Sequence, residues 1–394
     1  MSRTTSILFA THISYLDGAI EHIKIASQDY KNYHVVITLS PKQVYKNILD
    51  IRHVRLSDYN TLVNFDDIVK DWKLQVLKPY FINCASVHFL IYQEQGAINA
   101  FKTTKIFNNF LNKLGPSTLH FDSYINRQIF QIPFLFKHRE KLILNVHDAK
   151  PHSGEEDKTR ILLQKLLYRW SPKFVTFSDF SKNQLKEQVK LDKSIINSFL
   201  LPFNFYKNFK SKKPETIQNS VKISFVGRIS KYKGIDLFVD AINKIHKELP
   251  EIEFVIAGKS FGGYHPNYES VLKKDKLTII NGHLSNTEIV DIVDDSQLIV
   301  CPYLDASQSG VVMMSLALGK PILVTSAGGL KEYIEEGENG IICEIDANDI
   351  AEKIIKYLKN DYFKILSSKI RKKQTSHLIE QRYLKILSKI YSKK

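Results

Sequence analysis

The chain has 394 residues, of which 43% are hydrophobic and 25% charged, and its formal net charge is +15. This length suggests two domains rather than one. Nothing approaches the run of roughly 20 uncharged apolar residues that a membrane-spanning helix needs, and the first residues lack the layout of a signal peptide. Three scattered cysteines fit neither a disulfide framework nor a zinc site, so we expect a reducing, cytoplasmic location.

Both halves of the chain are basic. Residues 1–200 carry 27 Lys and Arg against 18 Asp and Glu, a net charge of +9, which leaves +6 for the remainder. Such a balance favours nucleic acid, an anionic membrane face or phosphorylated ligands. A lysine-rich surface that reflects compositional bias is an equally good interpretation. Because no basic helix with interleaved aromatic residues stands out, we expect no nucleic-acid partner.

The first half alternates between strand and helix patterns. An apolar run at Ile7–Ala10 is followed by a polar loop that ends at Gly18, and a helix is expected from Ala19 onward. Further strands are predicted at His34–Leu39, Val87–Ile91, Thr118–Phe121, Leu142–Val146 and Phe174–Phe177, and helices at Arg160–Trp170 and Lys182–Val189. This alternation predicts a doubly wound α/β domain with a parallel sheet.

The predicted strand Leu142–Val146 runs directly into a polar loop that contains His147, Asp148 and His152. In open α/β sheets, ligands bind beyond the carboxyl ends of the strands. We therefore interpret these three side chains as candidates for contact with a ligand. A histidine that serves only the fold is the alternative.

The stretch 202–220 is polar and lysine-rich and contains two prolines, which is typical of a connection between domains. A second alternation of strands and helices follows it. We therefore predict a first domain at 1–205, a linker at 206–220, a second domain at 221–374 and a C-terminal helix at 375–394.

Two stretches of the second domain carry candidate anion-binding groups. After the predicted strand Val221–Val226, the turn at Gly227 leads into a basic loop with Arg228 and Lys233. Arginine offers a planar fork for phosphate oxygens, and lysine offers a mobile point charge. Two solvated surface cations are the alternative.

The second stretch follows the predicted strand Leu298–Cys301. A polar loop after this strand leads into a helix that is expected at Val311–Leu318, with Ser309 and Gly310 at the helix start. Unpaired N–H groups and the positive end of the helix dipole make such a start an anion site, and Ser307 and Ser309 can cap the helix or donate a hydrogen bond. A capped core helix after a buried strand is an equally good interpretation.

With these motifs placed, the chain resembles the GT-B family 4 glycosyltransferases, which are retaining, nucleotide-sugar-dependent enzymes. The resemblance is densest from Phe225 to Gly340, in the segments FVGRISKYKGIDLFVDAI, VIAG, PYLDASQSGVV, GKPILVTSAGGLKE and GENGII. The loop NVHDAKPHSGE resembles the family's acceptor-domain loop, and ASQSGVV is similar to the ATQSGV-like loop of one branch. The resemblance implies two doubly wound Rossmann-like α/β domains that face a cleft, with the C-terminal helix returning to the N-terminal domain.

The resemblance also implies roles for particular residues. Arg228 and Lys233 would grip the donor diphosphate together with the amides of the 309–311 helix start, and His147 would lie near the donor sugar. Asp305 would stand near the first of two motif glutamates, whereas the second falls at Met313 or Met314, so that ribose recognition passes to Glu332 or to backbone groups. The implied catalytic set is His147, Asp305, Arg228 and Lys233; the donor-binding set is Gly18, Gly227, Arg228, Lys233, Gly258, Ser309, Gly310, Val311 and Glu332; and Asp148 and His152 are on the acceptor side.

The function implied by this resemblance is transfer of a sugar from a UDP- or GDP-sugar to a hydroxyl of a glycan or lipid-linked saccharide, in bacterial surface polysaccharide biosynthesis. No cofactor or metal ion is expected. The basic first half predicts peripheral docking on an anionic membrane, with Ile106–Leu114 and Arg160–Trp170 as candidate helices. The apolar faces of these two helices could equally belong to the core. The alternative function is that of a non-catalytic, nucleotide-sugar-binding partner subunit, which the missing second glutamate would favour.

Overall fold

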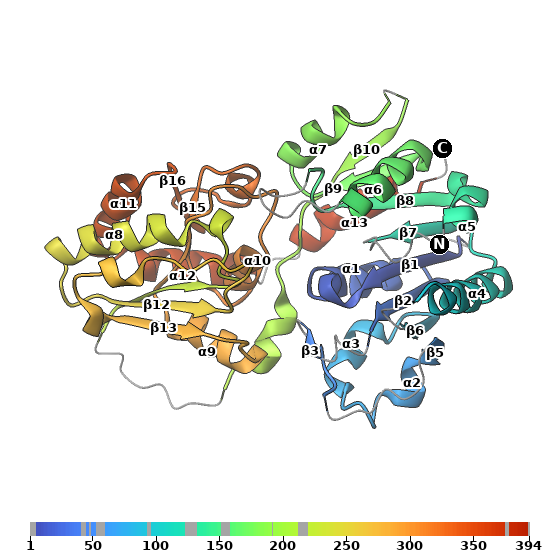
Figure 1. Cartoon of the computed structure of the whole chain (residues 1–394), viewed down its shortest axis with the longest axis horizontal. Helices are drawn as coiled ribbons and strands as arrows, with labels where there is room; N and C mark the ends of the chain where they lie inside the picture. The colour runs from blue at the N-terminus through green and yellow to red at the C-terminus, as the bar shows by residue number, and fades with distance from the viewer. Residues whose placement is uncertain are drawn as a thin grey trace. The chain divides into compact units, whose positions relative to one another are not determined.

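The computed structural model describes residues 5–40, 45–46, 49–52, 60–92, 96–122, 132–150, 158–190, 192–211, 220–374 and 378–392. They form two compact units: unit 1 holds the described residues up to 201 and from 378 onward, and unit 2 holds those from 202 to 374. Each unit is a largely parallel sheet flanked by helices (Figure 1). The expected fold class, α/β with two Rossmann-like domains, is confirmed.

Unit 1 is built on an eight-stranded sheet. Its strands are β1 (Ile7–His12), β2 (Tyr33–Leu39), β5 (Thr61–Asn64), β6 (Ser86–Ile91), β7 (Thr118–Phe121), β8 (Leu142–Val146), β9 (Lys173–Thr176) and β10 (Ser194–Asn197), and a separate short hairpin joins β3 (Tyr45–Lys46) to β4 (Leu49–Asp50). Its α-helices are α1 (Leu16–Asp29), α2 (Phe65–Ile68), α3 (Lys78–Phe81), α4 (Ala97–Leu114), α5 (Ile132–Lys137), α6 (Lys158–Trp170), α7 (Asp179–Lys186) and α13 (Leu378–Ile390), with 3-10 turns at Ile13–Tyr15, Gln75–Leu77 and Arg139–Lys141.

The strand order of unit 1 is β10-β9-β8-β7-β1-β2-β6-β5, and only β5 runs antiparallel to its neighbour. All six residues of β1 are buried, as expected for a central parallel strand that is covered on both faces. From β1 the chain proceeds in one direction to β2 and β6 and in the other to β7 and β8. The order therefore reverses between β1 and β7, and the carboxyl ends of these strands are where a ligand site is expected.

The C-terminal helix α13 belongs to unit 1, which confirms that it returns to the N-terminal domain. Tyr383, Leu387 and Ile390 are its buried residues. Beyond its last turn, the ammonium group of Lys173 donates hydrogen bonds to the carbonyl oxygens of Ile390 (2.8 Å) and Ser392 (2.9 Å). A buried cation at a helix C-terminus satisfies carbonyls that have no partner within the helix.

Unit 2 is built on a six-stranded parallel sheet of order β13-β12-β11-β14-β15-β16. Its strands are β11 (Lys222–Val226), β12 (Glu253–Gly258), β13 (Leu277–Asn281), β14 (Leu298–Cys301), β15 (Ile322–Thr325) and β16 (Gly340–Cys343). Its helices are α8 (Ile235–Glu248), α9 (Asn286–Asp295), α10 (Gly310–Ala317), α11 (Ala347–Lys359) and α12 (Tyr362–Gln374), with 3-10 helices at Asn204–Phe209, Lys231–Lys233, Tyr268–Ser270, Lys274–Lys276 and Leu330–Tyr333. The strand order reverses between β11 and β14.

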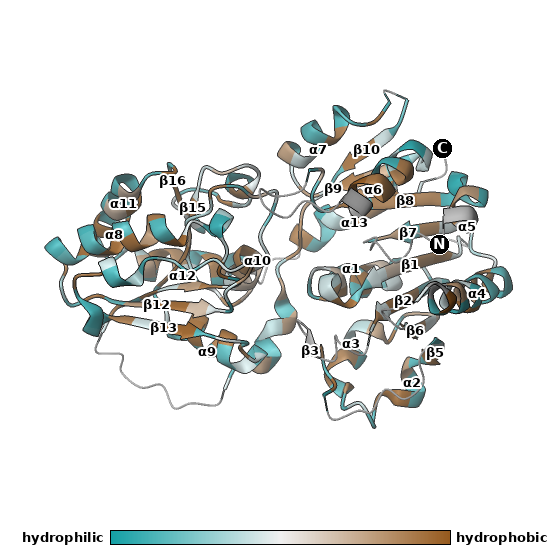
Figure 2. Cartoon of the chain, in the orientation of Figure 1, coloured by the Kyte–Doolittle hydropathy of each residue, from teal (hydrophilic) through white to brown (hydrophobic). Residues whose placement is uncertain are grey.

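The amphipathic pattern of the helices decides how they cover this sheet. In α8 the buried residues Ile235, Phe238, Val239, Ile242 and Ile245 recur at helical spacing. In Figure 2 the same helix carries both hydrophilic and hydrophobic bands, whereas strand β12 is mostly hydrophobic.

The predicted linker begins inside the 3-10 helix Asn204–Phe209, and its residues 212–219 lie outside the described residues. The predicted domain limits stay predictions.

Candidate functional site

The two predicted cations of unit 2 lie at the point where the strand order reverses. Arg228 follows Gly227 directly at the carboxyl end of β11, and Lys233 is the last residue of the 3-10 helix Lys231–Lys233. The loop after β14, the other strand at this point, leads into α10. Both stretches therefore leave their strands where open α/β sheets place ligands.

Aromatic side chains contact and hold both cations. One guanidinium nitrogen of Arg228 donates to the hydroxyl of Tyr232 (2.8 Å), and the guanidinium carbon lies 4.7 Å from the ring centre of Phe261. The Lys233 ammonium lies 3.6 Å from the ring centre of the buried Tyr303. An aromatic face attracts and orients a cation but leaves its charge in place, whereas a carboxylate would neutralise that charge. Both cations are thus partly preorganised for an anionic ligand.

These three aromatic residues were missed by the sequence analysis. Tyr232 lies between the two cations in the chain, and Tyr303 follows the proline that ends β14, so both stand inside motifs that were already singled out. Phe261 lies in a different loop, after β12, and no local pattern connects it to Arg228.

The start of α10 differs from one expectation. Ser309 precedes the helix, but its side chain makes no capping hydrogen bond; its hydroxyl lies 3.2 Å from the hydroxyl of Tyr303. Of the two roles expected for Ser309, capping the helix or donating a hydrogen bond, capping is not seen, because the buried tyrosine competes for the serine hydroxyl. The first-turn N–H groups, which start at Gly310, are consequently not satisfied by this side chain, as an anion site at a helix start requires.

Two glycines make a close backbone approach beneath this site. The amide of Gly227 donates to the carbonyl of Ala257 (2.9 Å). Gly258 has a φ of +152°, and a Cβ built on it would meet the carbonyl oxygen of Gly227 at 1.8 Å. Gly258 is therefore a packing requirement of the turn that carries Arg228.

The remaining predicted donor residues lie in neighbouring loops. Asp305 is half-buried in the loop before α10, and Glu332 is exposed on the 3-10 helix Leu330–Tyr333. The amide of Gly329 donates to the carbonyl of Ala306 (2.9 Å), which ties these two loops together. Val311 lies in the first turn of α10, and its Cγ2 atom would be 3.4 Å from a Cβ built on Gly227.

Met313 and Met314 stand where the resemblance places the second motif glutamate, and both are buried. Their side chains fill the interior of unit 2. Neither is therefore available to hold a ribose hydroxyl.

A second cluster lies in unit 1, at the carboxyl ends of β7 and β8. His147 follows β8 directly, and its Nε2 atom lies 3.0 Å from Oδ1 of Asp122, which follows β7. The same carboxylate accepts hydrogen bonds from Nδ2 of Asn145 (2.7 Å) and from the hydroxyl of Thr11 (2.7 Å). The ring of His147 lies between those of Tyr15 and Phe177, at centroid distances of 4.8 and 4.9 Å.

This arrangement decides the charges of the pair. Burial alone lowers the pKa of His147, but the charge of Asp122 and its hydrogen bond outweigh burial, so the net pKa is raised. Burial alone raises the pKa of Asp122, but the charge of His147 and three hydrogen bonds to the carboxylate outweigh it, so the net pKa is lowered. A carboxylate that accepts several hydrogen bonds favours its ionised form. The hydrogen bond from Nε2 to Asp122 therefore fixes the orientation of the His147 ring.

Asp122 was not predicted, although a signal existed. It directly follows the correctly predicted strand Thr118–Phe121, next to the point where the strand order reverses. Its partner Asn145 is a buried residue of β8, inside the predicted strand Leu142–Val146. The 25 positions between Asp122 and His147 hide their contact from any local pattern.

Gly18 does not lie in a loop. It is the third residue of α1, because the 3-10 turn Ile13–Tyr15 leads straight into the helix, and its amide donates to Oδ1 of Asp17 (2.9 Å). The expected loop position is therefore wrong. Burial raises the pKa of Asp17 to about 6, and the neighbouring Asp122 adds to this while His147 and two amides oppose it.

Of the two predicted acceptor-side residues, Asp148 is half-buried and its charge helps to raise the pKa of His147. His152 lies outside the described residues. Within the described part of the chain, no group of three or more His, Cys, Asp or Glu side chains could hold a metal ion. That the protein needs no metal ion or cofactor stays a prediction.

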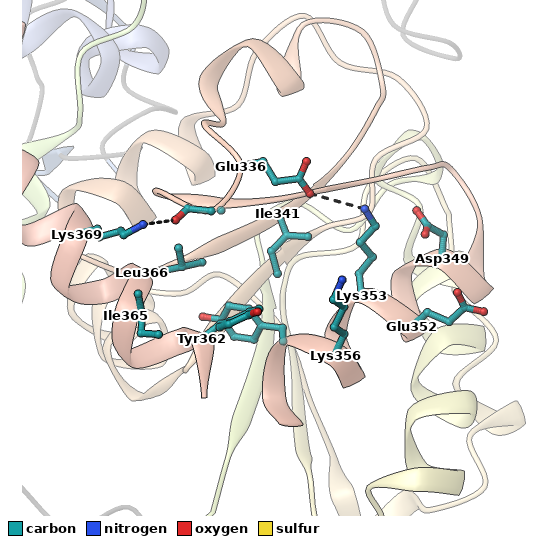
Figure 3. A pocket seen from close by; sticks show the side chains of 13 residues that line it. Glu336, Ile341, Asp349, Glu352, Lys353, Lys356, Tyr362, Ile365, Leu366 and Lys369 are labelled. Carbon is teal, nitrogen blue, oxygen red and sulfur yellow. Dashed lines mark hydrogen bonds and ion pairs between the residues drawn. The ribbon is translucent and has the colours of Figure 1, made fainter. Parts of the chain in front are cut away.

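A pocket of about 530 Å³ lies elsewhere in unit 2, between α11 and α12 (Figure 3). Ile341, Ile365 and Leu366 contribute apolar surface, and Lys353, which pairs with Glu336 at 3.7 Å, lies on its wall. None of the predicted site residues lines it.

Solved structures share this architecture over nearly the whole chain. HepE from Anabaena, in complex with UDP, aligns with a TM-score of 0.62 at 13% identity, covering 98% of this chain and 100% of its own. Sucrose-phosphate synthase from Thermosynechococcus elongatus aligns with a TM-score of 0.66 at 13% identity, covering 98% and 99%. The two Rossmann-like units thus define the GT-B fold.

Sequence comparison narrows this class. Residues 220–360 match the family model of glycosyl transferases group 1. An uncharacterized glycosyltransferase of Methanocaldococcus jannaschii is 27% identical over 197 residues, which is 48% of this chain and 51% of that protein. An alpha-D-kanosaminyltransferase of Streptomyces kanamyceticus is 19% identical over 242 residues, 58% of this chain and 61% of that protein.

The chain thus spans roughly half to three fifths of the length of these curated relatives. The segment that matches the group 1 glycosyltransferase model, residues 220–360, includes both cations and the α10 helix start.

Proposed function

We propose that the protein is a retaining glycosyltransferase that moves a sugar from a UDP- or GDP-sugar to a hydroxyl of a glycan or lipid-linked saccharide. The observation that carries the proposal is the placement of Arg228 and Lys233. Both lie at the carboxyl end of β11, on aromatic seats, inside the segment that matches the group 1 family. The UDP-bound structures of similar fold support a nucleotide-sugar donor.

In this mechanism the two cations stabilise the departing diphosphate as its negative charge grows. The first-turn amides of α10 add donors to the same anion. Removing one preorganised donor of this kind typically costs about 2.7–4 kcal/mol of transition-state stabilisation. The leaving phosphate takes the acceptor proton, so the scheme requires neither a separate general base nor a metal ion.

The unit 1 cluster supplies the sugar and acceptor contacts in this proposal. His147, held by Asp122, makes a polar contact to the donor sugar, and Asp148 and His152 serve the acceptor side. Asp305 contacts the donor hexose, and Glu332 or backbone groups hold the ribose. These assignments extend the resemblance of the sequence to particular side chains.

The process proposed for the enzyme is bacterial surface polysaccharide assembly at an anionic membrane. No described helix is both long and apolar enough to cross a bilayer. On α4, however, Ile98 and Phe101 are 73% and 66% exposed next to the exposed Lys102 and Lys105. Such a surface suits the interface of an anionic leaflet.

The apolar face of Ile106–Leu114, which the sequence left open between a membrane and the core, packs largely in the core. Phe107 and Leu111 are buried in the core of unit 1. Flotation with vesicles of neutral or anionic phospholipid tests the revised surface. The double variant Ile98→Ser, Phe101→Ser is expected to lose binding to anionic vesicles, and equal binding to neutral vesicles would contradict the proposal.

Two other functions fit parts of the evidence. A non-catalytic partner subunit fits the burial of Met313 and Met314, where the second motif glutamate is missing. A nucleotide-sugar epimerase fits the fold alone, since UDP-GlcNAc 2-epimerase from Neisseria meningitidis aligns with a TM-score of 0.57 at 13% identity.

Turnover assays with UDP- and GDP-sugars and a panel of saccharide acceptors separate these functions. The ¹H coupling constant of the new anomeric proton reports the configuration of the product. The proposal expects a glycoside with the donor's configuration. An inverted product would overturn the retaining mechanism, an isomerised nucleotide sugar would favour the epimerase, and donor binding without turnover would favour the partner subunit.

A further inference from the structure

A buried polar network runs through unit 1 from the C-terminal helix toward His147. Its hydrogen bonds join the hydroxyl of Tyr391 to Nδ1 of His120 (2.8 Å) and Nε2 of His120 to Oδ1 of Asn145 (2.7 Å). Nδ2 of Asn145 then donates to Asp122 (2.7 Å), which holds His147. Apart from His147, which is half-buried, every member is buried.

The direction of each hydrogen bond follows from the carboxylate. An ionised Asp122 only accepts, so Asn145 must turn its NH₂ group toward it and its oxygen toward His120. His120 must then carry its proton on Nε2 in order to donate to that oxygen. Burial lowers the pKa of His120 to about 4, so the ring is neutral and its Nδ1 accepts from the hydroxyl of Tyr391.

A second arm of the network anchors its far end. The hydroxyl of Tyr391 also lies 3.2 Å from that of Tyr33, and Nε2 of His22 lies 2.8 Å from the Tyr33 hydroxyl. Nδ1 of His22 contacts the hydroxyl of Tyr383 on α13 (2.8 Å). Since Lys173 holds the carbonyls at the end of the same helix, the position of the Tyr391 hydroxyl depends on how α13 is seated.

We propose that His120 and Tyr391 are positioning residues for His147, which they orient through Asn145 and Asp122. The inference rests on the proposed role of His147 in sugar transfer. Buried hydrogen bonds in series polarise one another and fix a single arrangement of their side chains. The seating of the C-terminal helix therefore sets the orientation of a side chain that lies more than 240 positions earlier in the sequence.

A network that serves the fold alone would make different predictions. It would leave the His147 ring as well ordered without Tyr391 as with it, provided that unit 1 stays folded. A positioning network instead couples the Tyr391 hydroxyl to the proton that His147 shares with Asp122. That proton has its own spectroscopic signature, because a ring N–H bonded to a buried carboxylate exchanges slowly and resonates far downfield.

The test uses the full-length protein with ¹⁵N-labelled histidine. In the wild type, NMR is expected to show His120 as the Nε2–H tautomer and a downfield proton on Nε2 of His147. In Tyr391→Phe the His147 signal is expected to broaden or disappear. The control is Tyr30→Phe, which removes a hydroxyl that donates to the Leu387 carbonyl of α13 (3.5 Å) but keeps the ring that packs on Tyr391 (5.0 Å between ring centres).

The same variants are then assayed for sugar transfer. Tyr391→Phe is expected to lower kcat about tenfold with KM within about twofold, because a misplaced catalytic group slows the reaction more than it weakens binding. His120→Gln, whose amide can still donate to Asn145, is expected to retain more activity than His120→Phe.

Three results would overturn the inference: an Nδ1–H tautomer of His120 in the wild type, an unchanged His147 signal in Tyr391→Phe, or unchanged kcat in both Tyr391→Phe and His120→Phe. The wild-type tautomer decides the question even where a variant fails to fold. The NMR measurements need no donor or acceptor. They therefore stand if the protein transfers no sugar, and their failure would leave the proposed function intact.

Discussion

The α-carbon of Gly258, at the end of β12, packs against the carbonyl oxygen of Gly227, at the end of β11. A Cβ on Gly258 would lie 1.8 Å from that oxygen, and the φ of +152° is itself unfavourable for other residues. The two strands can therefore come together under the Arg228 turn only if Gly258 has no side chain.

Gly258→Ala is accordingly expected to destabilise unit 2 by about 3 kcal/mol or more, since neither backbone can move without breaking the sheet. Chemical denaturation monitored by circular dichroism measures the change. Gly282→Ala is the matched control, because nothing lies within 4 Å of a Cβ built there and its φ is not in the positive range. Equal stability of the two variants would contradict the packing argument.

The His147–Asp122 pair predicts a change in titration. In Asp122→Asn the burial of His147 remains but the main cause that raises its pKa is lost, so the pKa is expected to fall below its ordinary value near 6.5. NMR titration of the ring measures this. Asp148→Asn, which removes a weaker contribution, should lower the pKa less. An unchanged pKa in Asp122→Asn would show that the pair does not form in solution.

The same pair has a stability consequence of known sign. Because the folded pKa of His147 is raised, its stabilising contribution is fully present below pH 6.5 and is lost as the pH rises through the folded pKa. Removing Asp122 should therefore cost more stability at pH 6 than at pH 9.

The buried His22 predicts acid sensitivity in the opposite sense. Burial, assisted by the neighbouring His120, lowers the pKa of His22 to about 3. Between this pH and pH 6.5, the unfolded state therefore binds a proton on His22 that the folded state does not bind. Each pH unit below 6.5 should cost about 1.4 kcal/mol through this group. In His22→Gln the loss of stability between pH 6.5 and 5 should therefore be about 2 kcal/mol smaller, measured by urea denaturation.

His283→Gln, at an exposed position, is the control for the loss of a histidine side chain. An identical acid dependence in His22→Gln and the wild type would refute the burial of a neutral His22.

Much of the fold could be predicted because many of its strands are short, largely buried and mostly apolar runs between polar loops. The strands Thr118–Phe121, Leu142–Val146 and Leu298–Cys301 match the structure residue for residue. By contrast, β10 and β16 were not predicted. Both lie at sheet edges and are only partly buried, so they lack the continuous apolar signal.

Helix starts were predicted less well. The helix expected at Lys182–Val189 runs from Asp179 to Lys186, because the hydroxyl of Ser178 accepts a hydrogen bond from the Ser181 amide (3.1 Å) and so caps an earlier start. A serine in a polar stretch has many such options, and the sequence alone does not rank them.

Some residues of the candidate site could be predicted from local motifs, and others could not. Arg228, Lys233 and the α10 helix start lie in contiguous motifs and could be singled out directly. Their aromatic seat Phe261 and the His147 partner Asp122 come from other strands, and the contact between His120 and Tyr391 spans 271 positions. Contacts of this kind are set by strand order, which local patterns do not record.

The most direct test of the account is calorimetric titration of UDP and GDP into the wild type, Arg228→Ala and Lys231→Ala. Lys231 is an exposed cation of the same loop and controls for the loss of net charge. We expect one nucleotide to bind the wild type and Lys231→Ala with equal affinity. We expect roughly 10- to 100-fold weaker binding to Arg228→Ala, the value of a charge-assisted hydrogen bond. Equal affinity of Arg228→Ala, or no binding of either nucleotide to the wild type, would contradict the account.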